Sequence, residues 1–401
     1  MPTIDELLEE KFAEKLEPRD QAIAVLAARV AALEQDAPAP SPPVAEDEAA
    51  TAKREHVLKT ANGLPPGGIV HIPPGDTEWG EAATLEKVVH LKGRLKPDGK
   101  PATRIKLDRP GGAVLLACIG DGFKIQGLEL IGTGKRHKAS GLILAGTDNV
   151  AGYCVFRQFG RVACAIKERH REQIPYSLVH DSSFIENFYD PDGDGKRITH
   201  GYGVTVSAGD DVWNVDPAPG SRRMTVMQDC YGEGNRRFFD VGRGAHGALR
   251  DSTIVDTTPL SIMVRTHGAF ADYRVHSGRW MEVYRNRFSG SKRWFAAVAW
   301  MGGDGVFWGN EITDTNQMLV LGHEPISRKL KVDLLEKPAR EQTLFVYVWN
   351  NSHDLGRHET FGYMGGSKGA HAKLFEGQDV IRFRPMPDYA PLGEHPLKLA
   401  A

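Results

Sequence analysis

The chain has 401 residues, of which 41% are hydrophobic, and it contains 44 glycines and 24 prolines. This composition is typical of a turn-rich globular protein, and helix-length periodic stretches are too few for an α/β barrel. The formal net charge of −2 argues against a nucleic-acid-binding protein, because such binding depends on accumulated lysine and arginine. No apolar run of about 18 residues occurs, so membrane insertion is not expected.

Residues 1–35 differ in pattern from the rest of the chain, because they carry an apolar seam at helical spacing. The seam consists of Ile4, Leu7, Leu8, Phe12, Leu16, Ile23, Leu26, Val30 and Leu33. Since such a seam needs a partner, we expect a short coiled-coil segment that oligomerises and attaches the protein. The alternative is a helix that caps the first coil of the following domain. The acidic start, MPTIDELLEEKF, lacks the pattern of a signal peptide, so synthesis in a cytoplasm without a standard secretion signal is expected.

Residues 36–52 are rich in proline, alanine and acid, which predicts an extended linker. Short β-branched and aromatic strands that end in an Asn or Asp turn then recur along the chain. The turn positions Asp229, Asp251, Asn286, Asn310 and Asn350 follow one another at intervals of 22, 35, 24 and 40 residues. A period of a little over twenty residues with insertions predicts an all-β solenoid over 53–355, because one unit buries its apolar face only against its neighbours. Residues 356–401 are predicted to form an irregular C-terminal cap.

Four cysteines show no metal-ligand spacing and are predicted to be buried apolar residues: Cys118, Cys154, Cys164 and Cys230. Basic clusters fall where turns are expected, at 135–138, 167–171, 222–223 and 236–237. Each cluster is either ordinary solvated loop charge or a contact surface for an anionic glycan.

Three strands that precede Gly turns are predicted to lie at equivalent positions of successive coils. They are RFFDVG (237–242), SIMVRTHG (261–268) and AAVAWMGG (296–303), and they would place Asp240, then Arg265 and His267, then Trp300 on an outer face. Trp supplies a platform for a sugar ring, Arg pairs with a uronate or sulfate, and Asp with His can transfer a proton. The alternative is a polar ladder that only satisfies hydrogen bonds on a surface.

Two kinds of chemistry fit these residues, and the spacing requires neither. Glycoside hydrolysis needs a second carboxylate, for which Glu282 or Asp272 is available. Lyase chemistry needs a base near a uronate, with Arg265 or a cation neutralising the sugar carboxylate. The candidate catalytic residues are therefore Asp240, His267 and Glu282, and the candidate glycan-binding residues are Arg265, Trp300, Asp272 and Arg243.

The motif DPDGDG places Asp190, Asp192 and Asp194 at alternating positions before Gly195. This spacing matches the first half of a calcium-binding loop, although Gly201 stands where the final glutamate ligand belongs. The motif thus predicts either a Ca²⁺ site completed by other coils or an acidic turn that faces solvent.

The opening IPPGDTEW, the strand VVHLKG and the units GRWMEVYRNRFSG (278–290) and GGDGVFWGNEIT (302–313) carry a resemblance. They resemble the pectate-lyase-like superfamily of right-handed, single-stranded parallel β-helices, and within it the repeat proteins that bacteriophages use as tail spikes or fibres. The resemblance implies a homotrimer in the virion tail that recognises a host surface polysaccharide and joins other tail proteins through its N-terminal segment. A polysaccharide depolymerase, acting as lyase or hydrolase, and a purely structural virion component are the alternatives.

Overall fold

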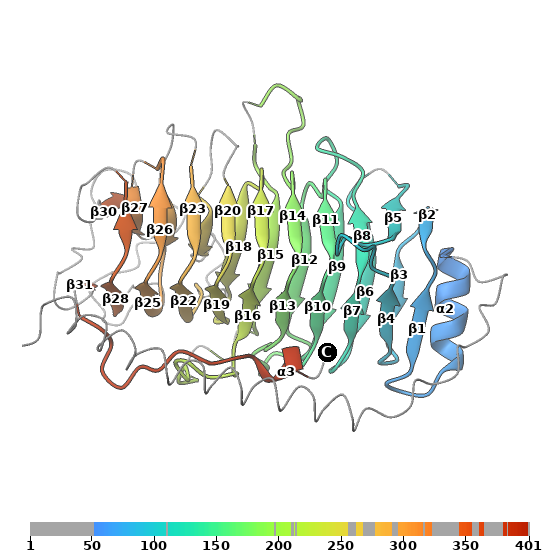
Figure 1. Cartoon of the computed structure of the whole chain (residues 1–401), viewed down its shortest axis with the longest axis horizontal. Coiled ribbons are helices and arrows are strands. Elements are labelled where there is room, and N and C mark those ends of the chain that lie inside the picture. Colours follow the sequence, from blue (N-terminus) through green and yellow to red (C-terminus); the bar gives the residue numbers. More distant parts are fainter. Residues whose placement is uncertain are drawn as a thin grey trace, which may run out of the picture. The chain divides into compact units, whose positions relative to one another are not determined.

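The computed structural model describes residues 52–109, 111–195, 198–209, 212, 215–255, 262–267, 277–290, 296–315, 317–322, 345–354, 361–364, 380–382 and 384–399. Their strands form three parallel sheets, which stack along one column (Figure 1). Each strand pairs with the strand three places further along the chain, so one coil of the column contributes one strand to each sheet. The parallel β-helix predicted from the recurrent strands is confirmed.

We name the three sheets A, B and C. Sheet A contains β1 (Ile69–Ile72), β4 (His90–Gly93), β7 (Lys124–Gln126), β10 (Val150–Gly152), β13 (Leu178–His180), β16 (Thr225–Gln228), β19 (His246–Arg250), β22 (Trp280–Tyr284), β25 (Asp304–Trp308), β28 (Val346–Trp349) and β31 (Val380–Arg382). Sheet B contains β2 (Gly75–Trp79), β5 (Thr103–Leu107), β8 (Leu128–Ile131), β11 (Val155–Arg157), β14 (Ser183–Ile185), β17 (Tyr231–Glu233), β20 (Thr253–Val255), β23 (Arg287–Ser289), β26 (Glu311–Thr313) and β29 (Ser352–His353). Sheet C contains β3 (Ala83–Leu85), β6 (Val114–Ile119), β9 (Ser140–Ala145), β12 (Val162–Lys167), β15 (Tyr202–Ser207), β18 (Arg237–Gly242), β21 (Val264–Thr266), β24 (Ala296–Trp300), β27 (Gln317–Gly322) and β30 (Phe361–Met364).

The core of the column consists of apolar side chains that stack from coil to coil. In sheet A, for example, Ala151, Val179, Met227 and Leu249 occupy one register position and are all fully buried. Each large apolar side chain buried in this way contributes on the order of 1.5–3 kcal/mol. The four cysteines are free thiols in the same core, at the buried positions that the sequence predicts.

The turn between sheets A and B explains why Asn and Asp recur in the sequence. Asp229, Asp251 and Asn350 occupy left-handed backbone positions, with φ of 51–53°, a conformation that Asn and Asp tolerate better than most residues. In two other coils, Asn286 and Asn310 lie one residue later, where their side chains form a ladder. Asn310 Oδ1 accepts hydrogen bonds from the backbone N and the Nδ2 of Asn286, at 3.0 and 3.1 Å. The predicted recurrence of Asn and Asp in this turn is confirmed, but the five residues chosen for it come from two different positions of the turn.

The N-terminal end of the column is covered by helix α2 (Arg54–Gly63), as Figure 1 shows. Val57 and Ala61, one helical turn apart, are buried in the core, and Trp79 Nε1 donates a hydrogen bond to the Ala52 carbonyl at 3.0 Å. The sequence had placed a strand-forming region here, beginning at residue 53. The predicted helical segment in residues 1–35 and nearly all of the predicted linker lie outside the described residues. None of the helices in the described ranges is long and apolar enough to cross a membrane.

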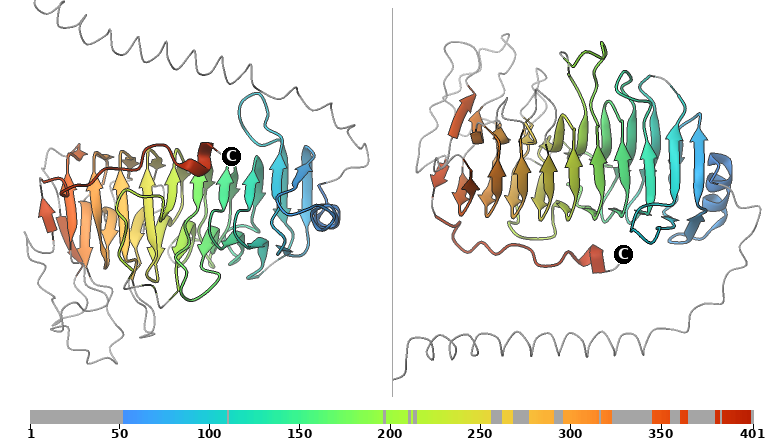
Figure 2. Two further views of the ribbon diagram at one scale, coloured as in Figure 1. Left: turned by 90° about the horizontal axis from the view of Figure 1, so that it is seen from below. Right: turned by 45° about the horizontal axis from the view of Figure 1, so that its top comes forward.

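The column continues past residue 355, because β30 and β31 add further strands to sheets C and A. Residues 384–399, which we call the C-terminal strap, then run back along the outer face of sheet A and end in α3 (Pro396–Leu399) (Figures 1 and 2). The strap packs apolar side chains against outward residues of that sheet: Met386, Tyr389, Leu392 and Leu397 on Val150, Leu178, Met224, Val226, Ala248, Trp280, Val306 and Trp349. Lys398 fastens its end through ion pairs with Asp181 at 3.0 Å and Asp229 at 2.7 Å.

Candidate functional site

A group of polar side chains lies on the outer face of sheet C, and a bulge in β18 helps to create it. Phe238 and Phe239 are consecutive residues, yet both point into the core. The N–H groups of both residues donate to the Met263 carbonyl, at 2.6 and 3.3 Å, which is the pattern of a β-bulge. Because two successive residues face inward, Arg237 before them and Asp240 after them share the outer face, with Arg237 Nη1 3.7 Å from Asp240 Oδ2.

The strand register sets Thr205, Asp240 and Arg265 side by side on β15, β18 and β21. The predicted proximity of Asp240 and Arg265 therefore agrees with the structure. The prediction for Trp300 is wrong, because the register continues the row from Arg265 to Ala299. Trp300 lies one position further on, in the core and with no exposed surface. A slip of one residue moves a strand side chain from one face of the sheet to the other.

Asp240, Arg265 and His267 form a connected network. Arg265 Nε donates to Asp240 Oδ2 at 3.3 Å, and Arg265 Nη2 lies 2.8 Å from His267 Nδ1. Since a guanidinium only donates, Nδ1 accepts this hydrogen bond, and the neutral imidazole carries its proton on Nε2. Asp240 and Arg265 are 5% and 4% exposed, so their charges compensate each other away from solvent.

The environment lowers the pKa values of two groups in this network, the Asp240 carboxyl and the His267 imidazole. Burial opposes ionisation of Asp240, but His267, Arg265 and Arg237 together outweigh it and hold the pKa of Asp240 below its ordinary value. Burial lowers the pKa of His267 to about 3; Asp240 opposes this shift, and Arg265 and Arg237 add to it. At neutral pH the network therefore contains a carboxylate and a neutral imidazole.

Tyr202, which the sequence analysis did not select, completes the site at the start of β15. Its hydroxyl accepts hydrogen bonds from Arg237 Nη1 at 3.2 Å and Arg236 Nη1 at 3.5 Å, and the Arg237 guanidinium lies 5.6 Å from its ring centre. The available signal was positional, because Tyr202 begins the strand one coil before Arg237. Arg236 and Arg237 were recognised only as a basic cluster in a turn.

Glu282 does not belong to this site. It lies on β22 of sheet A, beneath the C-terminal strap, and is 1% exposed. Its carboxylate accepts hydrogen bonds from Gly220 N at 2.7 Å, Trp280 Nε1 at 2.9 Å and Tyr389 Oη at 2.8 Å, and burial raises its pKa. The prediction that Glu282 acts with Asp240 is wrong, and Glu282 holds the strap in place.

The two remaining predicted glycan-binding residues are Arg243 and Asp272. Arg243 is exposed in the turn after β18, at a left-handed φ of 52°. Its charge partly opposes the rise in the pKa of Glu168 that burial causes. Asp272 lies outside the described residues.

The predicted calcium motif forms a closed loop. Asp190 is buried, and its two carboxylate oxygens accept hydrogen bonds from Gly193 N at 3.0 Å and Gly195 N at 2.9 Å. Asp192 and Asp194 are exposed on this loop. Within the described residues, no group of three or more His, Cys, Asp or Glu side chains is placed to hold a metal ion. The backbone thus uses the Asp190 carboxylate that a calcium site would need.

Positive charge extends from Tyr202 toward the corner between sheets B and C. Burial lowers the pKa of His200, and the nearby charges of Lys138, Arg236, Arg161 and Arg237 lower it further. In the other direction, the outward side chains of sheet C beyond the Asp240 network are apolar and buried: Ala296, Ala299, Met301 and Val320.

We expect the stability of the protein to fall as the pH is lowered from 6.5 to about 3. His267 has a folded-state pKa of about 3, below its ordinary 6.5, so the unfolded chain binds the proton first and the stability from neutral His267 is lost in this range. His246 and His395, both with a pKa lowered by burial to about 4, act in the same direction. The depressed pKa of Asp240 adds a loss below its ordinary 3.8.

Denaturant unfolding measured across this pH range tests the expectation. The variant His267→Gln, which stays neutral, should show a shallower decline than the wild-type protein. Equal slopes for the two proteins would contradict the placement of a neutral imidazole in the network.

Comparison with solved structures finds a similar fold in an alginate lyase. An alginate lyase from Paenibacillus sp. str. FPU-7 matches with a TM-score of 0.53 and 12% identity, over 78% of this chain and 96% of that one. A family 6 polysaccharide lyase from Pseudopedobacter saltans matches with a TM-score of 0.45 and 12% identity, over 79% and 78% of the two chains. A mannuronic-acid-specific family 6 lyase from human gut microbiota matches with a TM-score of 0.44 and 15% identity, over 75% and 73%. No protein-family model and no curated protein sequence matches the chain. At 12% identity, the likeness to the alginate lyase shows the parallel β-helix fold alone.

Proposed function

We propose that this protein binds an acidic polysaccharide along the outer face of sheet C and cleaves it by β-elimination. The observation that carries the proposal is the position of the Tyr202 hydroxyl, 3.2 and 3.5 Å from the guanidinium groups of Arg237 and Arg236. Arginine pairs well with carboxylates, and tyrosine is able to transfer protons in catalysis. The alginate lyase of similar fold shows that a parallel β-helix can support such an activity.

The proposed reaction balances without a cofactor or water. Arg236 and Arg237 bind the uronate carboxylate and stabilise the negative charge that develops on it. Tyr202, acting as a phenolate beside these two guanidinium groups, accepts the proton at C5, next to that carboxylate. The electron pair of the C5–H bond forms a C4=C5 double bond, the C4–O bond breaks, and Tyr202 delivers the same proton to the leaving oxygen. Asp240 and Arg265 act as positioning residues, because their ion pair fixes Arg237 and His267.

The same geometry argues against hydrolysis by two carboxylates. A general acid must hold its proton near neutral pH, but the pKa of Asp240 is lowered. Of the two residues predicted as the second carboxylate, Glu282 lies on another sheet and beneath the strap, and Asp272 lies outside the described residues. Among the described residues, the cluster fits elimination better than it fits a hydrolase pair.

A second candidate is recognition of a host surface polysaccharide without cleavage, as in a bacteriophage tail spike or fibre. The compensated Asp240–Arg265 pair favours it, since a satisfied buried network suits a rigid binding face. In this proposal the protein is a homotrimer in the virion tail, attached to other tail proteins through residues 1–35. A purely structural virion component, with no glycan affinity, is the remaining form of this candidate.

Product analysis separates these functions. The purified chain is incubated with uronate-containing polysaccharides and, as a control, with neutral ones. Elimination is expected to create ultraviolet-absorbing unsaturated uronate ends, and only in the acidic substrates. New ends that are saturated would indicate hydrolysis. Binding without new ends would favour the tail-spike candidate, and no binding across the panel would leave only the structural role.

A further inference from the structure

A cavity of about 820 Å³ lies at the corner between sheets B and C, outside the Tyr202 cluster. Two connections from sheet B to sheet C build its walls: residues 132–139 after β8 and residues 186–195 with residue 198 after β14. Asp190 N donates to the Lys135 carbonyl at 2.9 Å and so joins the two walls. Asp190 also closes its own loop through Gly193 and Gly195, which makes the cavity a built feature of the fold.

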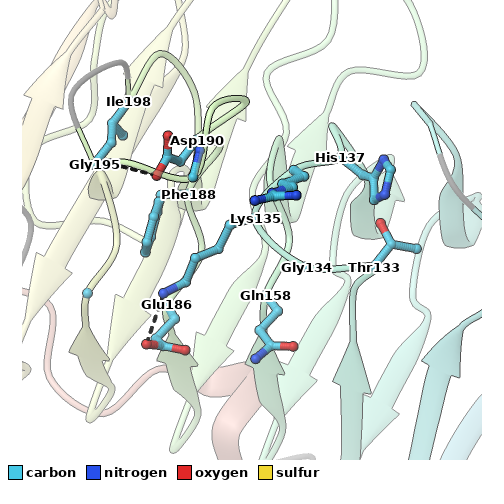
Figure 3. A pocket seen from close by; sticks show the side chains of 13 residues that line it. Thr133, Gly134, Lys135, His137, Gln158, Glu186, Phe188, Asp190, Gly195 and Ile198 are labelled. Carbon is cyan, nitrogen blue, oxygen red and sulfur yellow. Dashed lines mark hydrogen bonds and ion pairs between the residues drawn. The ribbon is translucent and has the colours of Figure 1, made fainter.

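The cavity offers both positive and negative groups. Lys135 extends toward Glu186, with Nζ 3.2 Å from Oε1, and passes 4.4 Å from the ring centre of Phe188 (Figure 3). Gln158 borders the same cavity, and it follows β11 at the position where Glu186 follows β14 in the neighbouring coil. Arg136 is exposed, and its guanidinium forms no ion pair or hydrogen bond with the residues that the structure describes.

These groups indicate the chemistry of a ligand. A small inorganic anion would be repelled by the Glu186 carboxylate and would leave a cavity of this volume largely empty. A sugar acid fits better, because its hydroxyls donate to Glu186 and to the Gln158 amide oxygen, while its carboxylate pairs with Arg136. The volume lies within the usual range of small-molecule sites, about 300–1,000 Å³.

The cavity is physically connected to the Tyr202 cluster. Phe188 and Asp190 precede β15 in the chain, and β15 begins at Tyr202. Tyr189 and His200 form an antiparallel bridge, and their rings pack edge to face at 6.1 Å between centroids. Lys138 Nζ lies 5.0 Å from the ring centre of Tyr189, so a positive charge lies beside this bridge.

We propose that this cavity is a second subsite, which holds an acidic sugar residue of the same polysaccharide that crosses the face of sheet C. The identity of the ligand rests on the proposed function. The existence of the binding site is testable without any turnover, because the cavity lies outside the cluster to which chemistry is assigned.

The test compares the variant Arg136→Gln with the control Arg287→Gln, an exposed arginine on β23 of sheet B that lies outside the cavity lining. The probe is a uronate octasaccharide, and its affinity is measured by calorimetry. If the protein cleaves the probe, both variants are made in the Tyr202→Phe background. We expect Arg136→Gln to weaken octasaccharide binding about tenfold, since a charged hydrogen bond is lost. The control should bind like the parent, and a carboxyl-reduced octasaccharide should bind both variants equally.

Equal octasaccharide affinity for Arg136→Gln and the parent protein would overturn the second subsite, even if the chain proves to be a lyase. A selective loss of affinity in a protein that cleaves no polysaccharide would support the subsite and contradict the lyase function. The two proposals therefore fail separately.

Discussion

Replacement of Tyr202 with phenylalanine is expected to reduce the turnover of an acidic polysaccharide by about 10²–10⁴-fold, the usual contribution of a proton-transferring side chain. The substitution removes only the hydroxyl, so the ring that packs against Arg237 stays. We expect the affinity for intact polysaccharide to change little, because the guanidinium groups of Arg236 and Arg237 remain. The measurement is the initial rate of unsaturated-end formation, beside a binding isotherm for the same substrate.

The matched control is Tyr231→Phe. Tyr231 lies on β17 of sheet B, and its hydroxyl donates to Glu233 at 2.9 Å, so the substitution also removes one tyrosine hydroxyl bond from the column surface. Turnover should remain near that of the wild-type protein. Equal rates for Tyr202→Phe and the wild-type protein would rule out the assigned proton transfer. Equal losses in both variants would point to a general effect on the fold.

Replacement of Trp300 with alanine is expected to destabilise the protein by about 3–5 kcal/mol, as large-to-small changes in cores do. Trp300 lies fully inside the column, and it pairs with Leu321 in the strand register. The alanine variant would lose the transfer energy of the indole and leave a cavity between stacked coils. Urea unfolding followed by circular dichroism measures the effect without relying on tryptophan fluorescence.

The variant Trp300→Phe refines this prediction. Among the described residues, the buried Nε1 of Trp300 has no hydrogen-bond partner, so phenylalanine fills part of the space and removes an unsatisfied donor. A clearly smaller loss of stability is expected than for alanine. If Trp300→Ala instead left stability unchanged and weakened glycan binding, Trp300 would have to face outward, as the sequence pattern first indicated.

The parallel β-helix could be predicted from the sequence because every coil has the same structural requirements. Each coil needs a left-handed turn residue and an apolar strand of fixed periodicity, which is why Asp229, Asp251 and Asn350 stand out. It was harder to predict which face of its sheet each side chain occupies. Asp240 and Trp300 each lie two residues before a glycine, and Arg265 lies three residues before one. Alignment of the strands on these glycines therefore places Trp300, and not Ala299, in the row with Asp240. The β-bulge in β18 places two consecutive residues on the same face, and the sequence of one strand contains no pattern that predicts it.

Other parts of the site depend on contacts between distant segments. Tyr202 and Arg237 are 35 residues apart and meet because two coils stack. Glu282 was a candidate because glycoside hydrolysis needs a second carboxylate, but its partners Gly220 and Tyr389 come from elsewhere in the chain. The strap could not be foreseen either. Strands covered on both faces are apolar on both sides, and this pattern does not name the segment that covers them.

The most direct test of the account is a crystal structure of the Tyr202→Phe variant with a bound uronate oligosaccharide. We predict that the sugar lies along the outer face of sheet C, with a carboxylate within hydrogen-bonding distance of Arg236 or Arg237 and its C5 facing the position of the missing hydroxyl. An oligosaccharide bound on sheet A or sheet B, or one on sheet C whose carboxylates contact neither guanidinium, would contradict the account.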